Sequence, residues 1–244
     1  MKILVCISSV PDTTAKITFT PDNKEFVSAG VTFILNPYDE IALSKAVDLS
    51  VDGSTVTVIN VGEVSTEPVI RKALAIGAND AVRVNAAPRD AFFVATQIAD
   101  YVKKNPFDLI LCGRESSDHN GASVPTMIAE LLSIPCILFA KSLAISGLVA
   151  TIESEIEGGK EVISASLPLI AGASEGMAEW KIPNMRGIMS ARTKPLSVVE
   201  PVSTEQRVKI ISYDKPASRS TVKLINPDDA AKLFDILREE KKII

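Results

Sequence analysis

Apolar and polar residues alternate in two distinct patterns along the first half of the chain. Short runs that are apolar throughout predict strands buried on both faces of a parallel sheet, and the amphipathic segments between them predict helices. This alternation predicts an α/β fold, with a mostly parallel sheet flanked by helices and joined by right-handed crossovers. The expected strands are residues 2–8, 55–61, 81–84 and 108–112, and the expected helices are residues 38–49, 66–76, 90–103 and 121–132.

Other segments of the chain follow different patterns. Between the first strand and the first helix, residues 16–20 and 25–28 predict a small hairpin outside the sheet. From about Gly176 the periodicity is lost, which predicts a long irregular arm. The segments expected to extend the same sheet are residues 137–145, 148–155 and 162–167.

A last helix is predicted from Asn226. Asn226 suits the capping position, Pro227 suits the first helical position, and two aspartates follow in the first turn. Its apolar face, which we expect either to pack on a partner chain or to fold back, consists of Ala230, Leu233, Phe234 and Leu237. We therefore divide the chain into an α/β domain, residues 1–190, and a C-terminal arm and helix, residues 191–244.

Composition narrows the class of protein. Of the 244 residues, 46% are hydrophobic and 23% are charged, which is typical of a globular protein. A net charge of −4 and an aromatic content of 5% argue against nucleic-acid binding. Because His119 is the single histidine, a metal site built from several histidines is excluded.

The cysteines and the absence of targeting patterns indicate a compartment. Cys6, Cys112 and Cys136 are an odd number, lie far apart and sit in apolar runs, so we expect buried, reduced thiols. The N-terminus lacks a signal-peptide pattern, and no stretch approaches the roughly 20 apolar residues of a membrane span. We therefore expect a cytoplasmic protein that is not embedded in a membrane.

The strongest local signal is the loop that follows Gly113. A predicted buried strand ends there, and a polar loop leads to the small residues Gly121, Ala122 and Ser123 at the start of a helix. Free backbone N–H groups at a helix N-terminus favour a phosphate or another anion. The loop is neither a Walker motif nor Gly-x-Gly-x-x-Gly. The alternative is an ordinary strand–helix loop in which Asn120 caps the helix.

Two strand ends and the start of the first helix are expected at the same edge of the sheet, where parallel α/β sheets bind ligands. The first strand ends near Cys6, and the second ends at Val61. Asn36 leads into the first helix, where Asp39 lies in the first turn. Together they suit an adenosine, although each point taken singly is better explained as a turn.

No set of side chains is suited to catalysis. His119 lies two residues from Ser117 in one loop, and no Gly-x-Ser-x-Gly elbow presents a nucleophile. Asp118 and His119 are a weak candidate for an acid–base pair. We therefore expect a protein whose own side chains make and break no bonds.

A series of short motifs runs along nearly the whole chain. The motifs are Lys-Ile-Leu-Val-Cys-Ile at 2–7, Val-Pro-Asp-Thr at 10–13, Asn-Pro-Tyr-Asp-Glu-Ile-Ala-Leu at 36–43, Ile-Arg-Lys-Ala-Leu-Ala-Ile-Gly-Ala at 70–78, Asp-Leu-Ile-Leu-Cys-Gly-Arg at 108–114, Ala-Glu-Leu-Leu at 129–132 with Ile-Pro at 134–135, and Ile-Pro-Asn-Met at 182–185. Their order and spacing together resemble the β-subunit family of electron transfer flavoproteins.

The resemblance implies a Rossmann-like core of the adenine nucleotide α-hydrolase type. It implies a heterodimer with an α subunit and an FAD held between the two chains. Such a carrier shuttles electrons from flavin dehydrogenases of the acyl-CoA dehydrogenase type, as in fatty acid oxidation, to an acceptor oxidoreductase. The β chain would itself bury AMP or, in electron-bifurcating members, a second FAD. The flavin then supplies the redox chemistry, which accounts for the missing catalytic side chains.

The resemblance also assigns roles to individual residues. Tyr38 would approach the isoalloxazine of the shared FAD, and the C-terminal arm would clasp the α subunit. The nucleotide contacts would be Cys6, Ser8, Asn36, Asp39, Val61, Asp118, Asn120, Gly121, Ala122, Ser123 and Val124.

The same resemblance implies a docking loop for the partner dehydrogenase. This recognition loop would consist of Ile182, Pro183, Asn184 and Met185. One exposed aliphatic residue in it would give weak, fast-dissociating docking, which a shuttle requires. Its basic flank would be Arg186, Arg192 and Lys194.

Two departures from the family pattern concern the nucleotide site. Ser8 and Ser9 stand where members usually carry a lysine, and residues 115–123 differ from the usual Gln-Ala-Ile-Asp loop. The choice between AMP and FAD therefore stays open. The rival hypothesis is a stand-alone adenine-nucleotide-binding regulator of the stress-protein type, which does not need the residues after about 176.

Overall fold

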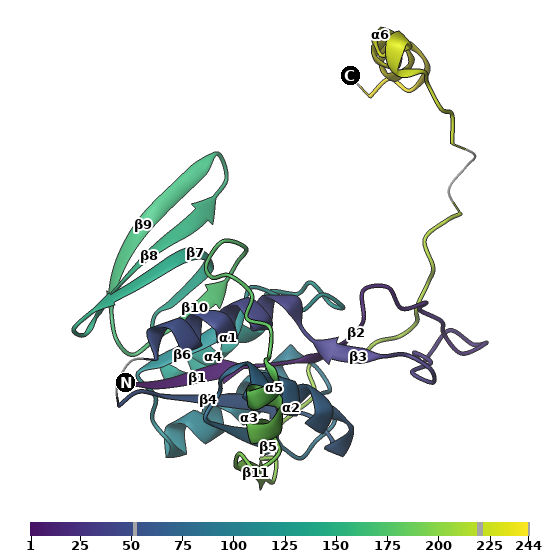
Figure 1. Cartoon of the computed structure of the whole chain (residues 1–244). Coiled ribbons are helices and arrows are strands. Elements are labelled where there is room, and N and C mark those ends of the chain that lie inside the picture. Colours follow the sequence, from purple (N-terminus) through teal and green to yellow (C-terminus); the bar gives the residue numbers. More distant parts are fainter. Residues whose placement is uncertain (51–52, 219–221, 244) are drawn as a thin grey trace.

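The structure is a computed structural model that describes residues 1–50, 53–218 and 222–243, and its centre is one large sheet. Within them, nine strands follow the order β11-β5-β4-β1-β6-β10-β7-β8-β9 (Figure 1). Neighbours from β11 to β7 are parallel, whereas β7, β8 and β9 pair antiparallel. The strands are β1 (Lys2–Cys6), β4 (Thr55–Val61), β5 (Asp80–Val84), β6 (Leu109–Gly113), β7 (Cys136–Ser146), β8 (Val149–Ile156), β9 (Gly159–Ser166), β10 (Leu169–Ala173) and β11 (Leu196–Val199).

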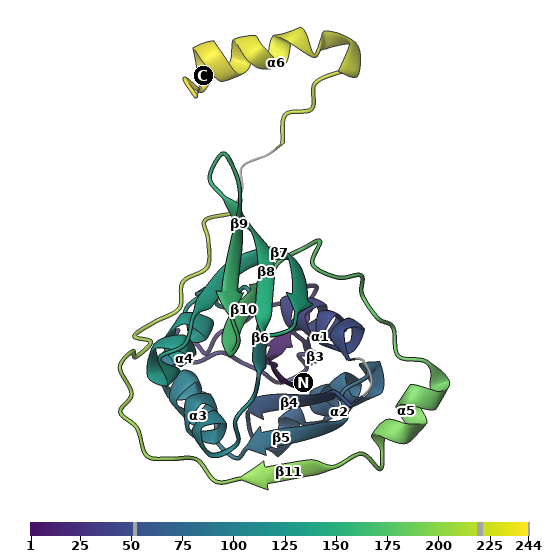
Figure 2. The same cartoon turned by 90° about the vertical axis from the view of Figure 1, so that its left-hand side faces the viewer.

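Helices cover both faces of the parallel part of the sheet (Figure 2). Successive side chains of a strand point to opposite faces. Ile3 and Val5 of β1 therefore lie in one buried cluster with residues of α1 and α2, and Leu4 and Cys6 lie in a second cluster with residues of α3 and α4. The four helices are α1 (Pro37–Leu49), α2 (Glu67–Ile76), α3 (Ala91–Lys104) and α4 (Val124–Leu132).

The α/β fold predicted from the sequence is confirmed. Strand β4 has the predicted bounds, and the other predicted strands and helices of the first half begin and end within three residues of their predicted positions. Strands β7, β8 and β9 extend the same sheet, as expected.

In the described residues from 167 to 199, three elements are not predicted by the sequence pattern. They are β10, β11 and the short helix α5 (Met185–Ala191). Each is short and is stabilised by partners distant in sequence: β10 lies between β6 and β7, β11 pairs with β5, and α5 packs on α2. Residues after 190 therefore contribute a strand to the main sheet.

The predicted hairpin between the first strand and the first helix is wrong in extent. A single antiparallel bridge, from Phe19 to Phe26, joins residues 16–20 to residues 25–28. The paired strands lie on either side of this excursion, as β2 (Ser9–Pro11) and β3 (Phe33–Leu35). Most residues of the excursion are exposed, so a longer hairpin would have no apolar face to pack against the domain.

After β11 the chain runs along α3. The side-chain amide of Gln97 and the backbone of Val202 exchange two hydrogen bonds of 2.9 and 2.7 Å. Asp90 caps α3 and also accepts hydrogen bonds from the backbone N–H groups of Arg207 and Val208, at 2.6 and 2.9 Å. The first part of the arm is therefore tied to the domain.

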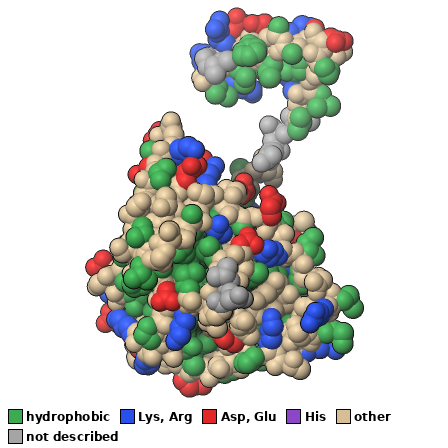
Figure 3. All heavy atoms as spheres, turned by 60° about the vertical axis from the view of Figure 1, so that its left-hand side comes forward, with side chains coloured by type: hydrophobic (Ala, Val, Ile, Leu, Met, Phe, Trp, Pro, Cys, Tyr) green, Lys and Arg blue, Asp and Glu red, His purple; other side chains and the backbone are tan. Residues whose placement is uncertain are grey.

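The end of the arm carries the predicted final helix. Asn226 accepts a hydrogen bond from the N–H of Asp228, and α6 (Ala231–Asp235) continues into a π-helical turn, Ile236–Glu240. This helix stands clear of the sheet in Figure 1, and hydrophobic side chains lie open along it in Figure 3. Among them, Phe234 is 67% exposed.

Candidate nucleotide-binding site

The sheet has a topological switch point beside β1. The chain passes from β1 through α1 to β4 and through α2 to β5, all on one side of β1, and α3 then carries it to β6 on the other side. The helices that follow β1 and β6 lie on opposite faces of the sheet. Doubly wound proteins bind ligands at the carboxyl ends of the strands at such a point.

Asp39 joins the two strands at this switch point. Its Oδ2 accepts hydrogen bonds from the backbone N–H and the hydroxyl of Ser8, at 2.8 and 2.7 Å, and its Oδ1 accepts one from the N–H of Gly113, at 3.0 Å. Burial raises the pKa of Asp39 to about 6, against these hydrogen bonds, which act to lower it. The carboxyl thus links β1, α1 and β6 at the expected edge.

Gly113 has no room for a side chain. A Cβ at this position would lie 2.4 Å from Oδ1 and 2.9 Å from the backbone N of Asp39. Asn36 adds two bonds to the same region: its Nδ2 donates to the carbonyl of Glu115 at 2.9 Å, and its Oδ1 accepts from the N–H of Ser117 at 3.2 Å. The start of α1 and the loop after β6 therefore form one hydrogen-bonded unit.

The loop before α4 has an unusual backbone. Asn120 and Ala122 take left-handed conformations, with φ of 49° and 46°. Within the described residues, the N–H groups of Gly121, Ala122 and Ser123 donate to no acceptor. Free N–H groups beside a helix N-terminus are what a phosphate requires.

Asn120 does not cap α4, contrary to the alternative considered from the sequence. The helix begins at Val124, with Ser123 at the capping position and no side-chain capping bond. Pro125 accounts for the later start, because proline fits the first turn of a helix best.

The carboxyl end of β4 contains polar residues that the sequence reasoning missed. Beside Val61, the Nδ2 of Asn60 donates to the carbonyl of Ile7 at 2.9 Å. The buried Arg83 on β5 donates from Nη1 to the carbonyl of Gly62 at 3.0 Å. The available signal was a polar amide, Asn60, and a charged residue, Arg83, near the ends of two mainly apolar strands. These bonds fix the edge where Val61 lies.

The thiols are free and mostly buried, as predicted. Cys6 and Cys112 lie at the ends of the neighbouring strands β1 and β6. A hydrogen bond with Cys6, together with burial, raises the pKa of Cys112 well above its usual range, and burial raises the pKa of Cys136 to about 11. The raised pKa values keep the thiols of Cys112 and Cys136 protonated at neutral pH.

Tyr38 lies beside an arginine that the sequence reasoning did not single out. The guanidinium of Arg114 is 5.5 Å from the ring centroid of Tyr38 and 4.9 Å from that of Phe139. A cavity of about 590 Å³ is lined by Arg114 and Phe139 with Glu155, Ile156 and Glu157. Tyr38 thus belongs to an aromatic and cationic group at the carboxyl end of β6.

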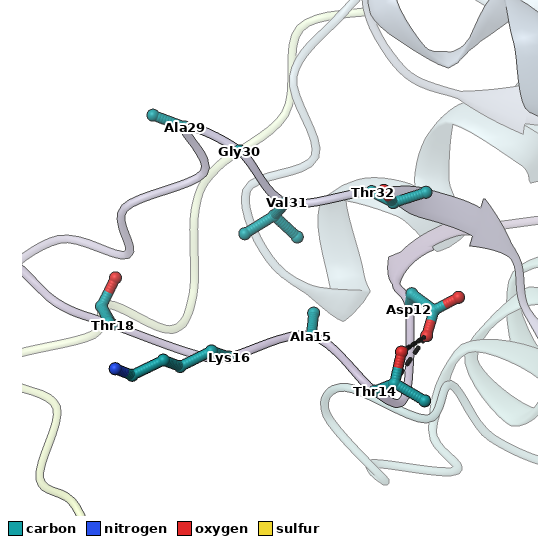
Figure 4. Close-up of a pocket in the computed structure, with 9 residues that line it drawn as sticks. All are labelled: Asp12, Thr14, Ala15, Lys16, Thr18, Ala29, Gly30, Val31 and Thr32. Atoms are coloured by element: carbon teal, nitrogen blue, oxygen red, sulfur yellow. Dashed lines mark hydrogen bonds between the residues drawn. The ribbon is translucent and has the colours of Figure 1, made fainter.

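A second, open cavity of about 440 Å³ lies in the excursion between β2 and β3 (Figure 4). Lys16 and Thr18 on one segment and residues 29–32 on the other line it. At its base, the carboxylate of Asp12 accepts hydrogen bonds from the N–H and hydroxyl of Thr14, at 2.8 and 2.6 Å. These two bonds lower the pKa of Asp12 and hold the turn that follows β2.

Asp118 and His119 lie at the surface of the β6–α4 loop. Nε2 of His119 is 3.8 Å from Oδ2 of Asp118, which is too long for a hydrogen bond, and the imidazole side chain is 73% exposed. Within the described ranges, no group of three or more His, Cys, Asp or Glu side chains is placed to hold a metal ion.

The predicted recognition loop is exposed and leads into α5. Ile182 is 88% exposed and Met185 is 74% exposed, Pro183 is half-buried, and Asn184 caps α5 by accepting a hydrogen bond from the N–H of Gly187 at 2.8 Å. The surface is broader than one aliphatic residue, because further apolar side chains of the same region are also exposed.

Comparison with known proteins shows the family to which the chain belongs. The family model described as "Electron transfer flavoprotein domain" matches residues 24–204. The electron transfer flavoprotein subunit beta of Syntrophomonas wolfei is 32% identical over 249 residues, covering 100% of this chain and 98% of that protein. The subunit of the same name from Bacillus subtilis is 33% identical and fully covered, and that of Homo sapiens is 31% identical with 98% of both chains covered.

The fold and its switch point define the class as a doubly wound α/β protein. Within that class, the chain belongs to the electron transfer flavoprotein family, among its β subunits. Members of this group are electron carriers rather than enzymes. No helix of the part of the chain that the structure describes is long and apolar enough to cross a membrane.

Proposed function

We propose that this chain pairs with an α subunit as a cytoplasmic heterodimeric carrier. It shares an FAD with that subunit, and it passes electrons from an acyl-CoA dehydrogenase-type flavin dehydrogenase to an acceptor oxidoreductase. The observation that carries the proposal is the match to β subunits along the whole chain, arm included. The free thiols suit a reducing compartment.

The β chain itself holds an adenine nucleotide in this proposal, either AMP or a second FAD. The left-handed loop at Asn120 and Ala122 and the free N–H groups from Gly121 to Ser123 fit a phosphate. The Asp39 junction and the tight approach at Gly113 keep that loop in place. The remaining contacts to the nucleotide are Cys6, Ser8, Asn36, Val61, Asp118 and Val124.

The shared FAD meets the β chain at Tyr38. When bound, the flavin supplies the redox chemistry, and the chain's own residues bind and orient it. The Arg114 guanidinium over the Tyr38 ring restrains that ring and places a positive charge beside it. A fixed cation near this position favours the negatively charged form of a ligand.

Residues 182–185 dock on the partner dehydrogenase. The exposed side chains of Ile182 and Met185 suit an apolar pocket on that partner. The exposed apolar face of α6 packs on the α subunit in this proposal, so that the arm holds the two subunits together. The stand-alone regulator is the weaker candidate, because the relatives match the arm as well as the core.

Co-expression with the α subunit tests the proposal. The two chains should co-purify, and the complex should show an oxidised-flavin absorption spectrum that is bleached by an acyl-CoA dehydrogenase and its acyl-CoA substrate. A complex without flavin, or a β chain that binds nucleotide but never its partner, would favour the regulator.

A further inference from the structure

The apolar surface beside the recognition loop depends on how α5 is held. Trp180, Ile182, Met185 and Met189 are each more than 60% exposed. Helix α5 has seven residues, and so short a helix is unstable without tertiary contacts. It packs against α2, beside which it lies in Figure 2.

Two cations join the C-terminal ends of these helices. Nζ of Lys194 donates to the carbonyls of Leu74 and Ala78, at 2.8 and 2.6 Å, where α2 ends. Nη1 of Arg71, on α2, donates to the carbonyls of Ala191 and Lys194, both at 2.8 Å, where α5 ends. Each cation thus meets carbonyls that lack helical partners and favour positive charge.

Lys194 is therefore not a solvent-facing member of the basic flank that the resemblance implies. Desolvation by partial burial lowers its pKa, in keeping with an ammonium packed between two helices. A third contact brings the backbones together, because a Cβ on Gly187 would lie 2.5 Å from the carbonyl oxygen of Ala75. Both ends of α5 are thus fixed: Asn184 caps its start, and Arg71 and Lys194 hold its end.

We propose that Arg71 and Lys194 are positioning residues for docking, which lock α5 onto α2 and hold the exposed side chains as a preorganised apolar surface. This inference rests on the proposed function, in which that surface meets a flavin dehydrogenase. A surface that is already ordered loses less conformational entropy on binding. Releasing the lock should therefore weaken association with the dehydrogenase, whereas flavin binding, which we assign to the region of Tyr38, should not change.

The test measures electron transfer from an acyl-CoA dehydrogenase and its acyl-CoA substrate to the purified heterodimer. Lys194→Met and Arg71→Met should each raise the KM for the heterodimer roughly tenfold, with kcat and flavin content kept within about twofold. Lys104→Met is the matched control, because it removes a positive charge from the exposed surface of α3, where Lys104 pairs with Asp100. Its KM should equal that of the wild type.

A double-variant cycle separates positioning from general destabilisation. In an Ile182→Ala/Met185→Ala background, Lys194→Met should add less than about twofold to KM, because the side chains that the lock positions are gone. Full additivity, or unchanged KM in both single variants, overturns the inference. If either variant fails to fold, hydrogen exchange of the wild-type heterodimer decides: slow exchange across residues 185–194 supports the lock, and exchange as fast as in an unfolded peptide overturns it. A wild-type heterodimer that accepts no electrons from the dehydrogenase refutes the proposed function instead.

Discussion

Replacing Asp39 by asparagine should remove a pH dependence from the stability of the chain. Its pKa of about 6 in the fold compares with 3.8 for an ordinary aspartate, so the folded state binds more protons than the unfolded state between these values. The contribution of protonated Asp39 to the free energy of unfolding is therefore fully present below pH 3.8 and is lost as the pH rises through about 6. The total is on the order of 3 kcal/mol, of which about 2 kcal/mol falls between pH 4 and pH 7.

Urea unfolding of the full chain, followed by circular dichroism at several pH values, measures this effect. The free energy of unfolding of wild type minus that of Asp39→Asn should fall by about 2 kcal/mol from pH 4 to pH 7. Asp48→Asn, which removes an exposed carboxylate from the same helix, is the matched control and should keep the wild-type slope. Parallel profiles for wild type and Asp39→Asn would refute the assignment of a buried, proton-binding carboxyl at the switch point.

Three further predictions concern the edge, the arm and the docking loop. Gly113→Ala should lower the free energy of unfolding by about 1–3 kcal/mol, because its Cβ has no space beside α1; an unchanged urea midpoint would argue against so close an approach. Asp90→Ala should speed tryptic cleavage after Arg207, because the Asp90 carboxylate accepts a hydrogen bond from the backbone N–H of Arg207. Asp100→Ala, a control on the same helix, should leave the cleavage rate unchanged. Equal cleavage rates in the two variants would mean that other contacts hold the arm. Ile182→Ala should slow electron transfer from the dehydrogenase with flavin content unchanged, and equal rates would remove Ile182 from the docking surface.

The parallel half of the fold was predictable from the sequence because its strands are buried on both faces. A run such as residues 55–61 is mostly apolar or β-branched and is buried after its first residue, and the helices between the runs are amphipathic, so both patterns are visible without tertiary knowledge. The meander after Pro135 was equally predictable from its turns at Ser146-Gly147 and Gly158-Gly159.

The elements that were missed depend on distant partners. Strand β11 has four residues, lies between prolines and gains its hydrogen bonds from β5. Helix α5 contains Gly187, where a Cβ would collide with the backbone of α2, and the carbonyl of its last residue accepts a hydrogen bond from Arg71, 120 residues earlier in the chain. Local pattern carries no information about such pairings.

Part of the candidate site was predictable in the same way. The loop after Gly113 and the start of α1 were identified because their residue types suit a helix N-terminus, and the topology brings them to one edge. Arg83 and Arg114 were not identified, because the bonds that involve them at this edge become visible only when neighbouring strands are aligned.

Mass spectrometry of the ligands released from the denatured heterodimer tests whether the β chain holds its own nucleotide at the β6–α4 loop. The wild type is compared with two variants of that loop. We expect one FAD with one AMP, or two FADs, in the wild type. Ala122→Glu places a carboxylate at the predicted phosphate position and should lose the AMP or the second FAD while keeping the shared FAD. His119→Glu adds the same charge at an exposed position of the same loop and should keep both. One FAD and no second nucleotide in the wild type, or identical ligands in wild type and Ala122→Glu, would contradict nucleotide binding at this loop of the β chain.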